Sequence, residues 1–90
     1  MPGHSIIEVE CKCEQPLAKY DKDAPGRLIK MYLSAILIDR AGIFLVDPPL
    51  QVGEHVNCPK CEERVATIQM IHGRHAAKMN QGAIKPIRTS

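Results

Sequence analysis

Aromatic residues are scarce in this chain of 90 residues, which has no Trp, one Phe and two Tyr. A hydrophobic core must therefore come mainly from Ile, Leu, Val and Met, and in so short a chain such a core is thin. Small domains with thin cores usually contain a further stabilising link, such as a metal ion. We expect a single domain over residues 1–85 that depends on such a link, followed by a loose basic tail over residues 86–90.

Long apolar runs are absent as well. The longest uncharged stretch in the middle of the chain, MYLSAILI, is far shorter than the ~20 residues that cross a bilayer. The N-terminal stretch MPGHSIIEVE lacks the basic start and apolar run of a secretory signal. We therefore expect no membrane segment and a cytoplasmic protein, in which cysteines serve as metal ligands or redox thiols more often than as disulfides.

The motifs of common enzymes are missing too. The sequence has no Gly-rich phosphate loop, no Ser-His-Asp arrangement and no pair of acidic residues placed for a cleft. His72 and His75 could each replace a cysteine as a metal ligand, but four cysteines are already present. We predict that the protein is not an enzyme.

The four cysteines are grouped in two short pairs, Cys11-x-Cys13 and Cys58-Pro-Lys-Cys61. The second cysteine of each pair lies in a similar phrase, KCEQPLAKY in one case and KCEERVATI in the other. Two such pairs, distant in sequence, can supply opposite edges of the tetrahedron that Zn²⁺ prefers. We predict one Zn²⁺ ion bound by all four cysteines; iron in a rubredoxin-like site with four sulfurs would use the same ligands.

Strand-like segments flank both cysteine pairs. SIIEVE precedes the first pair and PLAKY follows it, while EHVN precedes the second pair and RVATIQMI follows it. Alternation of apolar and polar residues and the content of β-branched residues favour strands in these segments. The two similar phrases thus predict two β-hairpins, each with a cysteine pair in its turn.

The segment between the pairs has the pattern of a helix from about Arg27 to Arg40. Leu28, Met31, Tyr32, Ala35 and Ile36 follow helical spacing, although the β-branched residues of the segment leave a strand open as an alternative. A helix that is apolar nearly all round is covered on more than one side. We expect the apolar segment 28–46 to dock on a partner protein or on a second copy of the chain.

These elements predict a small α+β fold, a zinc ribbon of two cysteine-bearing β-hairpins with one inserted helix. The chain resembles four-cysteine zinc ribbons over roughly residues 6 to 72, with a CxC pair in place of the first CxxC pair. Glu14 and Glu62 stand where zinc ribbons commonly have glycine. The cysteine pattern also resembles the zinc switch of redox-regulated holdase chaperones, which implies that exposed thiolates could respond to oxidants.

The net charge of +2 is unevenly distributed, because no acidic residue occurs after Glu63. We expect a short helical stretch from Arg74 to Asn80 in this basic part. A four-cysteine finger followed by basic residues is similar to phage Com-type translational activators, and the resemblance implies RNA binding. The residues that would contact phosphates are Arg74, His75, Lys78, Lys85 and Arg88.

The sequence leaves three functions open. The first is a non-enzymatic, zinc-stabilised interaction module or small accessory subunit that docks on a partner protein. The second is a zinc ribbon that regulates by binding RNA, and the third is a zinc-thiolate redox switch.

Overall fold

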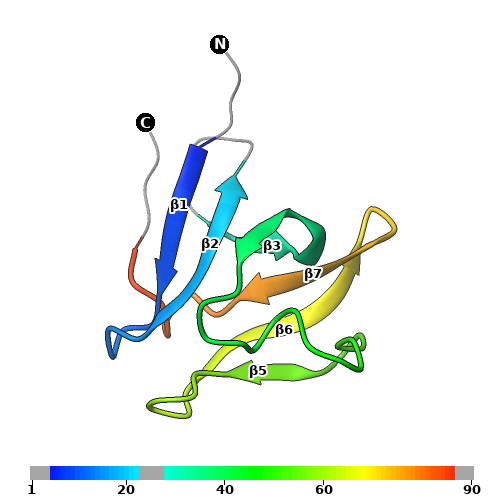
Figure 1. Cartoon of the computed structure of the whole chain (residues 1–90). Coiled ribbons are helices and arrows are strands. Elements are labelled where there is room, and N and C mark those ends of the chain that lie inside the picture. Colours follow the sequence, from blue (N-terminus) through cyan, green and yellow to red (C-terminus); the bar gives the residue numbers. More distant parts are fainter. Residues whose placement is uncertain (1–4, 23–27, 87–90) are drawn as a thin grey trace.

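The computed structural model describes residues 5–22 and 28–86 of the chain, and these residues form two antiparallel β-sheets (Figure 1). The elements are β1 (Ser5–Glu10), β2 (Pro16–Lys22), β3 (Lys30–Tyr32), a short 3-10 turn η1 (Leu33–Ala35), β4 (Ile36–Ile38), β5 (His55–Asn57), β6 (Arg64–Ile71) and β7 (Arg74–Met79). One sheet has the strand order β1-β2-β4 and the other has the order β3-β7-β6-β5. The strands of the two sheets run in different directions (Figure 1), and the chain passes from one sheet to the other between β3 and β4 and again between β4 and β5.

The strands expected beside the cysteines are present. SIIEVE forms β1, PLAKY begins β2, HVN forms β5 and RVATIQMI forms β6. The pairs β1–β2 and β5–β6 are both antiparallel, with one cysteine pair in each connecting turn. Burial alternates from Ala18 onward in β2 and from Ala66 to Gln69 in β6, after two consecutive buried residues in each strand.

The predictions of an α+β fold class and of an inserted helix are wrong. In the described part of segment 27–40, the chain forms β3, η1 and β4, and no longer helix is present in the described residues. β3 pairs with β7 and β4 pairs with β2, so this segment covers one edge of each sheet. A helix here would have left both edges without backbone partners, and pairing with two existing edges outweighs the local helical pattern.

The prediction of a helical stretch from Arg74 to Asn80 is also wrong. Arg74–Met79 forms β7, an inner strand of the four-stranded sheet. β6 and β7 are joined by His72 and Gly73, whose φ angles of 51° and 73° suit a tight hairpin turn. Once this hairpin forms, β7 is held between β6 and β3, and its helix-favouring alanines are fully buried in the sheet.

The hydrophobic core lies between the two sheets and draws on both. Its most deeply buried large side chains include Val9 and Leu17 from the first sheet, Met31 and Ile68 from the second, and Phe44 from the loop after β4. No helix in the described ranges is both long and apolar enough to cross a membrane. The tail expected after Pro86 lies outside the described residues.

Candidate metal centre

The first cysteine pair occupies the tight turn between β1 and β2. The backbone N–H of Cys11 donates to the carbonyl of Gln15 at 3.0 Å, and the N–H of Glu14 donates to the carbonyl of Cys11 at 2.8 Å. Glu14 has a φ of 77°, in the left-handed region that favours glycine. This bend directs Cys11 and Cys13 toward the second hairpin.

The second pair occupies a similar turn between β5 and β6. The N–H of Cys58 donates to the carbonyl of Glu63 at 2.8 Å, and the N–H of Glu62 donates to the carbonyl of Cys58 at 2.9 Å. Glu62 has a φ of 65°, so it matches Glu14 in conformation as well as in sequence. The backbone N–H of Lys60 also donates to Cys58 Sγ at 3.4 Å, as expected of a turn that stabilises a thiolate.

The four cysteine sulfurs meet at one point, as the sequence predicts. All four Sγ atoms lie within 4.8 Å of one another. Cys11 Sγ is 3.5 Å from Cys61 Sγ, and Cys13 Sγ is 3.6 Å from Cys58 Sγ. Thiolates about 2.3 Å from a tetrahedral zinc ion lie about 3.8 Å from one another, so the spacing of the four sulfurs suits a metal ion. None of the four cysteines forms a disulfide.

Burial and hydrogen bonding affect two of the thiols in opposite ways. Burial raises the pKa of Cys11 to about 12. Burial would raise the pKa of Cys58 as well, but backbone N–H groups of Cys61 and Lys60 stabilise its thiolate and bring its pKa to about 7. Of these two thiols, Cys58 is therefore the more ready to bind a cation at neutral pH in the metal-free protein.

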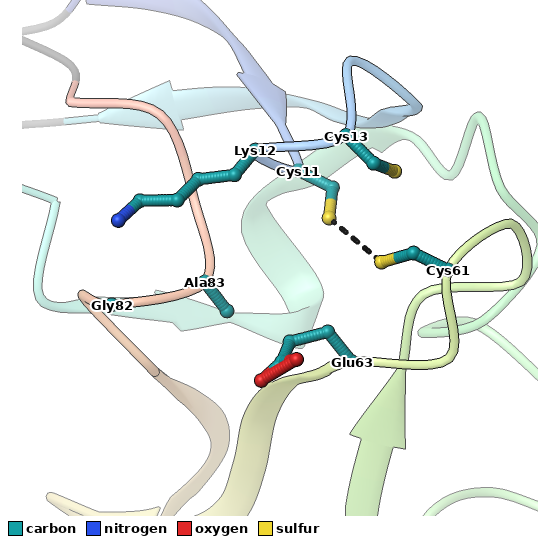
Figure 2. Close-up of a pocket in the computed structure, with 7 residues that line it drawn as sticks. All are labelled: Cys11, Lys12, Cys13, Cys61, Glu63, Gly82 and Ala83. Atoms are coloured by element: carbon teal, nitrogen blue, oxygen red, sulfur yellow. Dashed lines mark hydrogen bonds between the residues drawn. The ribbon is translucent and has the colours of Figure 1, made fainter.

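The cluster is closed on one side and open on the other. Cys11 and Cys58 are each 1% exposed and Cys13 is half-buried, whereas Cys61 is exposed. A hollow of about 340 Å³ opens beside the sulfurs of Cys11 and Cys61 (Figure 2). The side chain of Lys12 points away from the sulfurs in this view, and Lys12 is exposed. Small molecules can thus approach the cluster from the side of Cys61.

A third segment supports the first turn. The N–H of Lys12 donates to the carbonyl of Ala83 at 3.0 Å, and the N–H of Lys85 donates to the carbonyl of Glu10 at 2.9 Å. Residues 83–85 thus run alongside the end of β1, and Ala83 lines the hollow beside the cysteines (Figure 2). The sequence contains no local signal for this contact, because backbone bonds to a distant segment leave no pattern in side-chain type.

The residues predicted to contact nucleic acid do not form one cluster. Arg74 and Lys78 are exposed on β7 and point to the same face of the sheet, while His75, between them in register, points to the opposite face. Lys85 forms an ion pair with Glu10 at 3.3 Å. Arg88 lies outside the described residues.

Comparison of the chain with known protein families, with curated proteins and with solved structures found no match. Functional conclusions therefore depend on the site itself.

Proposed function

We propose that this chain is a non-enzymatic binding domain stabilised by one structural Zn²⁺ ion. The observation that carries this proposal is the convergence of four cysteine sulfurs within 4.8 Å of one another, from two hairpins. Four thiolates complete the coordination of a structural zinc ion, whereas a catalytic zinc ion keeps one position open for water or substrate. All-sulfur ligation therefore favours a structural role over a catalytic one.

Energetics support the same role. Structural zinc sites contribute on the order of 10–16 kcal/mol of apparent binding free energy, which is comparable with the ~5–15 kcal/mol net stability of a typical domain. Here the ion would link two hairpins whose strands belong to different sheets, β1–β2 and β5–β6. Such a link restricts the motion of one sheet relative to the other and keeps their outer surfaces in a fixed arrangement.

The test is the metal content of the purified chain, with circular dichroism before and after addition of a chelator. We expect one zinc ion per chain, and a large loss of stability to urea, followed by circular dichroism, when the ion is removed. Cys58→Ser should lose the metal, whereas the neighbouring Lys60→Ala should keep it, because Lys60 contacts Cys58 Sγ through its backbone. Iron in the site would be recognised by the colour of its thiolate complex. A metal-free chain that folds equally well with and without chelator would contradict the proposal.

A zinc-thiolate redox switch is the second candidate, favoured by the exposure of Cys61 beside the hollow. Hydrogen peroxide would oxidise the Cys11 and Cys61 thiolates: the S–S bond forms, the O–O bond breaks, and two hydroxide ions are produced while zinc leaves. The test is the rate of zinc release under peroxide, with mass spectrometry to locate the disulfide. Release no faster than from an ordinary structural site would exclude a switch.

Docking of the apolar segment 28–46 on a partner protein or a second copy stays a prediction. Without a helix, the support for it is reduced to exposed apolar side chains in this segment. These are Ile29, Leu37, Ile38 and Leu45. Self-association whose strength does not change with salt concentration would support this prediction.

A further inference from the structure

The four-stranded sheet contains no acidic residue. Its strands are β3 (KMY), β7 (RHAAKM), β6 (RVATIQMI) and β5 (HVN), with four Lys or Arg side chains and no Asp or Glu. The three-stranded sheet, in contrast, includes Glu8, Glu10 and Asp21 beside its lysines. Positive charge is therefore concentrated on one of the two sheets.

The strand register brings this charge to one face. Lys30 lies opposite Lys78, Lys78 lies opposite Thr67, and Thr67 lies opposite His55, in one row across four strands. Directly opposed residues of antiparallel strands point to the same side, while the next residue of each strand points into the core. The residues next to this row toward the core are Met31, Ala77, Ile68 and Val56, and all are buried. We call the outer side, with Lys30, Tyr32, Arg74 and Lys78, the basic face. Arg64 also lies on it, because the register shift between Val56 and Asn57 places Arg64 opposite Asn57, two positions from His55.

The placement of Lys30 and Lys78 opposes stability. Like charges directly opposite each other on neighbouring strands destabilise a sheet. Among the described residues, no acidic side chain forms an ion pair with either lysine. An arrangement that costs stability and has no neighbouring negative charge to offset it is expected where a ligand supplies that charge.

Tyr32 and Arg74 form a stacking pair beside the two lysines. The guanidinium of Arg74 lies over the Tyr32 ring, 4.1 Å from its centroid, and donates to Ser34 Oγ at 2.6 Å. Lys30 Nζ lies 5.7 Å from the same centroid. Arg74 is thus held over the ring, and guanidinium planes and aromatic rings are the groups on which unstacked nucleic-acid bases stack.

A polar hollow of about 320 Å³ lies on the same face. Arg64, Thr67, Gln69 and Lys78 are among the residues that line it. The hollow therefore combines two cations with hydroxyl and amide groups, which suits a phosphate together with the polar edge of a base.

We propose that the basic face binds single-stranded nucleic acid, with Lys30, Lys78 and Arg64 on phosphates and the Tyr32–Arg74 pair stacked against a base. This inference rests on the proposed binding function and names its ligand. A single strand is favoured because stacking needs bases that are not already stacked in a duplex. The binding surface therefore differs from the predicted C-terminal segment: it excludes His75 and Lys85 and adds residues of β3 and β6.

The first test is fluorescence anisotropy with labelled single-stranded oligouridylate, the matching oligodeoxythymidylate and a duplex of the same length, at several salt concentrations. The double variant Lys30→Gln/Lys78→Gln removes two charges from the basic face. Its control, Lys12→Gln/Lys19→Gln, removes two charges elsewhere, from one exposed and one half-buried lysine as in the test variant. Each phosphate contact contributes about 0.7 to the slope of log affinity against log salt concentration. The test variant should therefore lower the magnitude of this slope by about 1.4, and the control should leave it unchanged.

Tyr32 separates stacking from simple charge attraction. Tyr32→Leu should weaken oligouridylate binding about five- to hundredfold, in line with base–aromatic stacking, whereas Tyr32→Phe should bind like the unchanged chain. Equal affinity of the duplex, or equal binding by Tyr32→Leu with its metal content retained, would overturn the proposal. If the variants do not fold, backbone amide NMR shifts of the unchanged chain on addition of oligouridylate provide the test. Shifts on β3, β6 and β7 support the proposal, and shifts confined to β1 and β2 contradict it.

Metal content separates failure of this inference from failure of the proposed function. A chain that holds zinc and is destabilised by chelator, but binds neither oligonucleotide at low salt, supports the structural zinc site and contradicts the nucleic-acid proposal. A chain that lacks metal and folds regardless of chelator contradicts the zinc proposal, whatever it binds.

Discussion

Cys11 Sγ lies 3.5 Å from Cys61 Sγ, although the two residues are 50 positions apart in the chain. The other close pair, Cys13 and Cys58, also joins the two hairpins, at 3.6 Å. Both of these contacts therefore join one cysteine pair to the other. A metal ion at this point would link β1–β2 to β5–β6 directly, and it would close a long loop of chain.

Replacement of the ligands should separate metal binding from packing. Cys61→Ser and Cys11→Ser should each weaken zinc binding by more than about 100-fold, because even the partners of metal ligands are worth about 10–100-fold. In the presence of chelator, Cys11→Ser should still be the less stable of the two, since Cys11 is 1% exposed and Cys61 is exposed. Competition with a chromogenic chelator and urea unfolding measure the two effects. Unchanged zinc affinity in either variant would exclude that residue as a ligand.

The left-handed conformation of Glu14 and Glu62 predicts an unusual response to glycine. Their φ angles of 77° and 65° cost a residue with a side chain about 1–2 kcal/mol, and glycine avoids this cost. Glu14→Gly and Glu62→Gly should therefore leave the free energy of unfolding unchanged or raise it by up to about 1 kcal/mol, despite the greater freedom of glycine in the unfolded chain. Glu14→Val and Glu62→Val should lower it, because β-branched residues rarely adopt this conformation. Greater stability of the valine variants in urea unfolding would contradict this account.

The candidate metal site could be predicted from the sequence because short-spaced cysteine pairs leave a direct pattern. The spacing within each pair restricts both sulfurs to one turn, and the flanking apolar alternation predicts the strands that form that turn. Glu14 and Glu62 depart from the glycine of zinc ribbons, yet both adopt the left-handed conformation that glycine favours, so the departure changes the residue and keeps the shape of the turn.

The middle of the chain could not be predicted, because its structure depends on distant partners. Met31 is buried in β3 and Ile36 in β4, and helical spacing accounts for both residues equally well. Pairing of β3 with β7, more than forty positions later in the chain, decides between strand and helix. The row of Lys30 and Lys78 was missed for the same reason, since only the strand register places them together.

Asp39 should stabilise the loop that follows β4. Its carboxylate accepts hydrogen bonds from the backbone N–H groups of Ile43 at 3.1 Å, Phe44 at 2.8 Å and Leu45 at 2.8 Å. Asp39→Ala removes all three acceptor contacts beside the buried Phe44, and the expected loss in the free energy of unfolding is about 2–3 kcal/mol. Asp39→Asn keeps one oxygen as an acceptor, so its free energy of unfolding should fall by less. Urea unfolding measures these losses. The control is Asp47→Ala, which removes an exposed acid later in the same loop. An equal loss of stability in Asp39→Ala and Asp47→Ala would show that the hydrogen bonds of Asp39 contribute little.

Zinc affinity should rise with pH, with a change of slope near neutrality. A thiol that is protonated in the metal-free site must release its proton to bind zinc, so protons compete with the metal. Cys11, whose pKa burial raises to about 12, releases a proton throughout the neutral range. The pKa of Cys58 is about 7 because backbone N–H groups outweigh the effect of its burial, so this residue adds to the competition only below about pH 7. The slope of log affinity against pH should therefore increase by about one proton below that pH. Titration with a competing chelator across this range measures the slope. A constant slope through pH 7 would mean that the turn does not hold Cys58 as a thiolate before the metal binds.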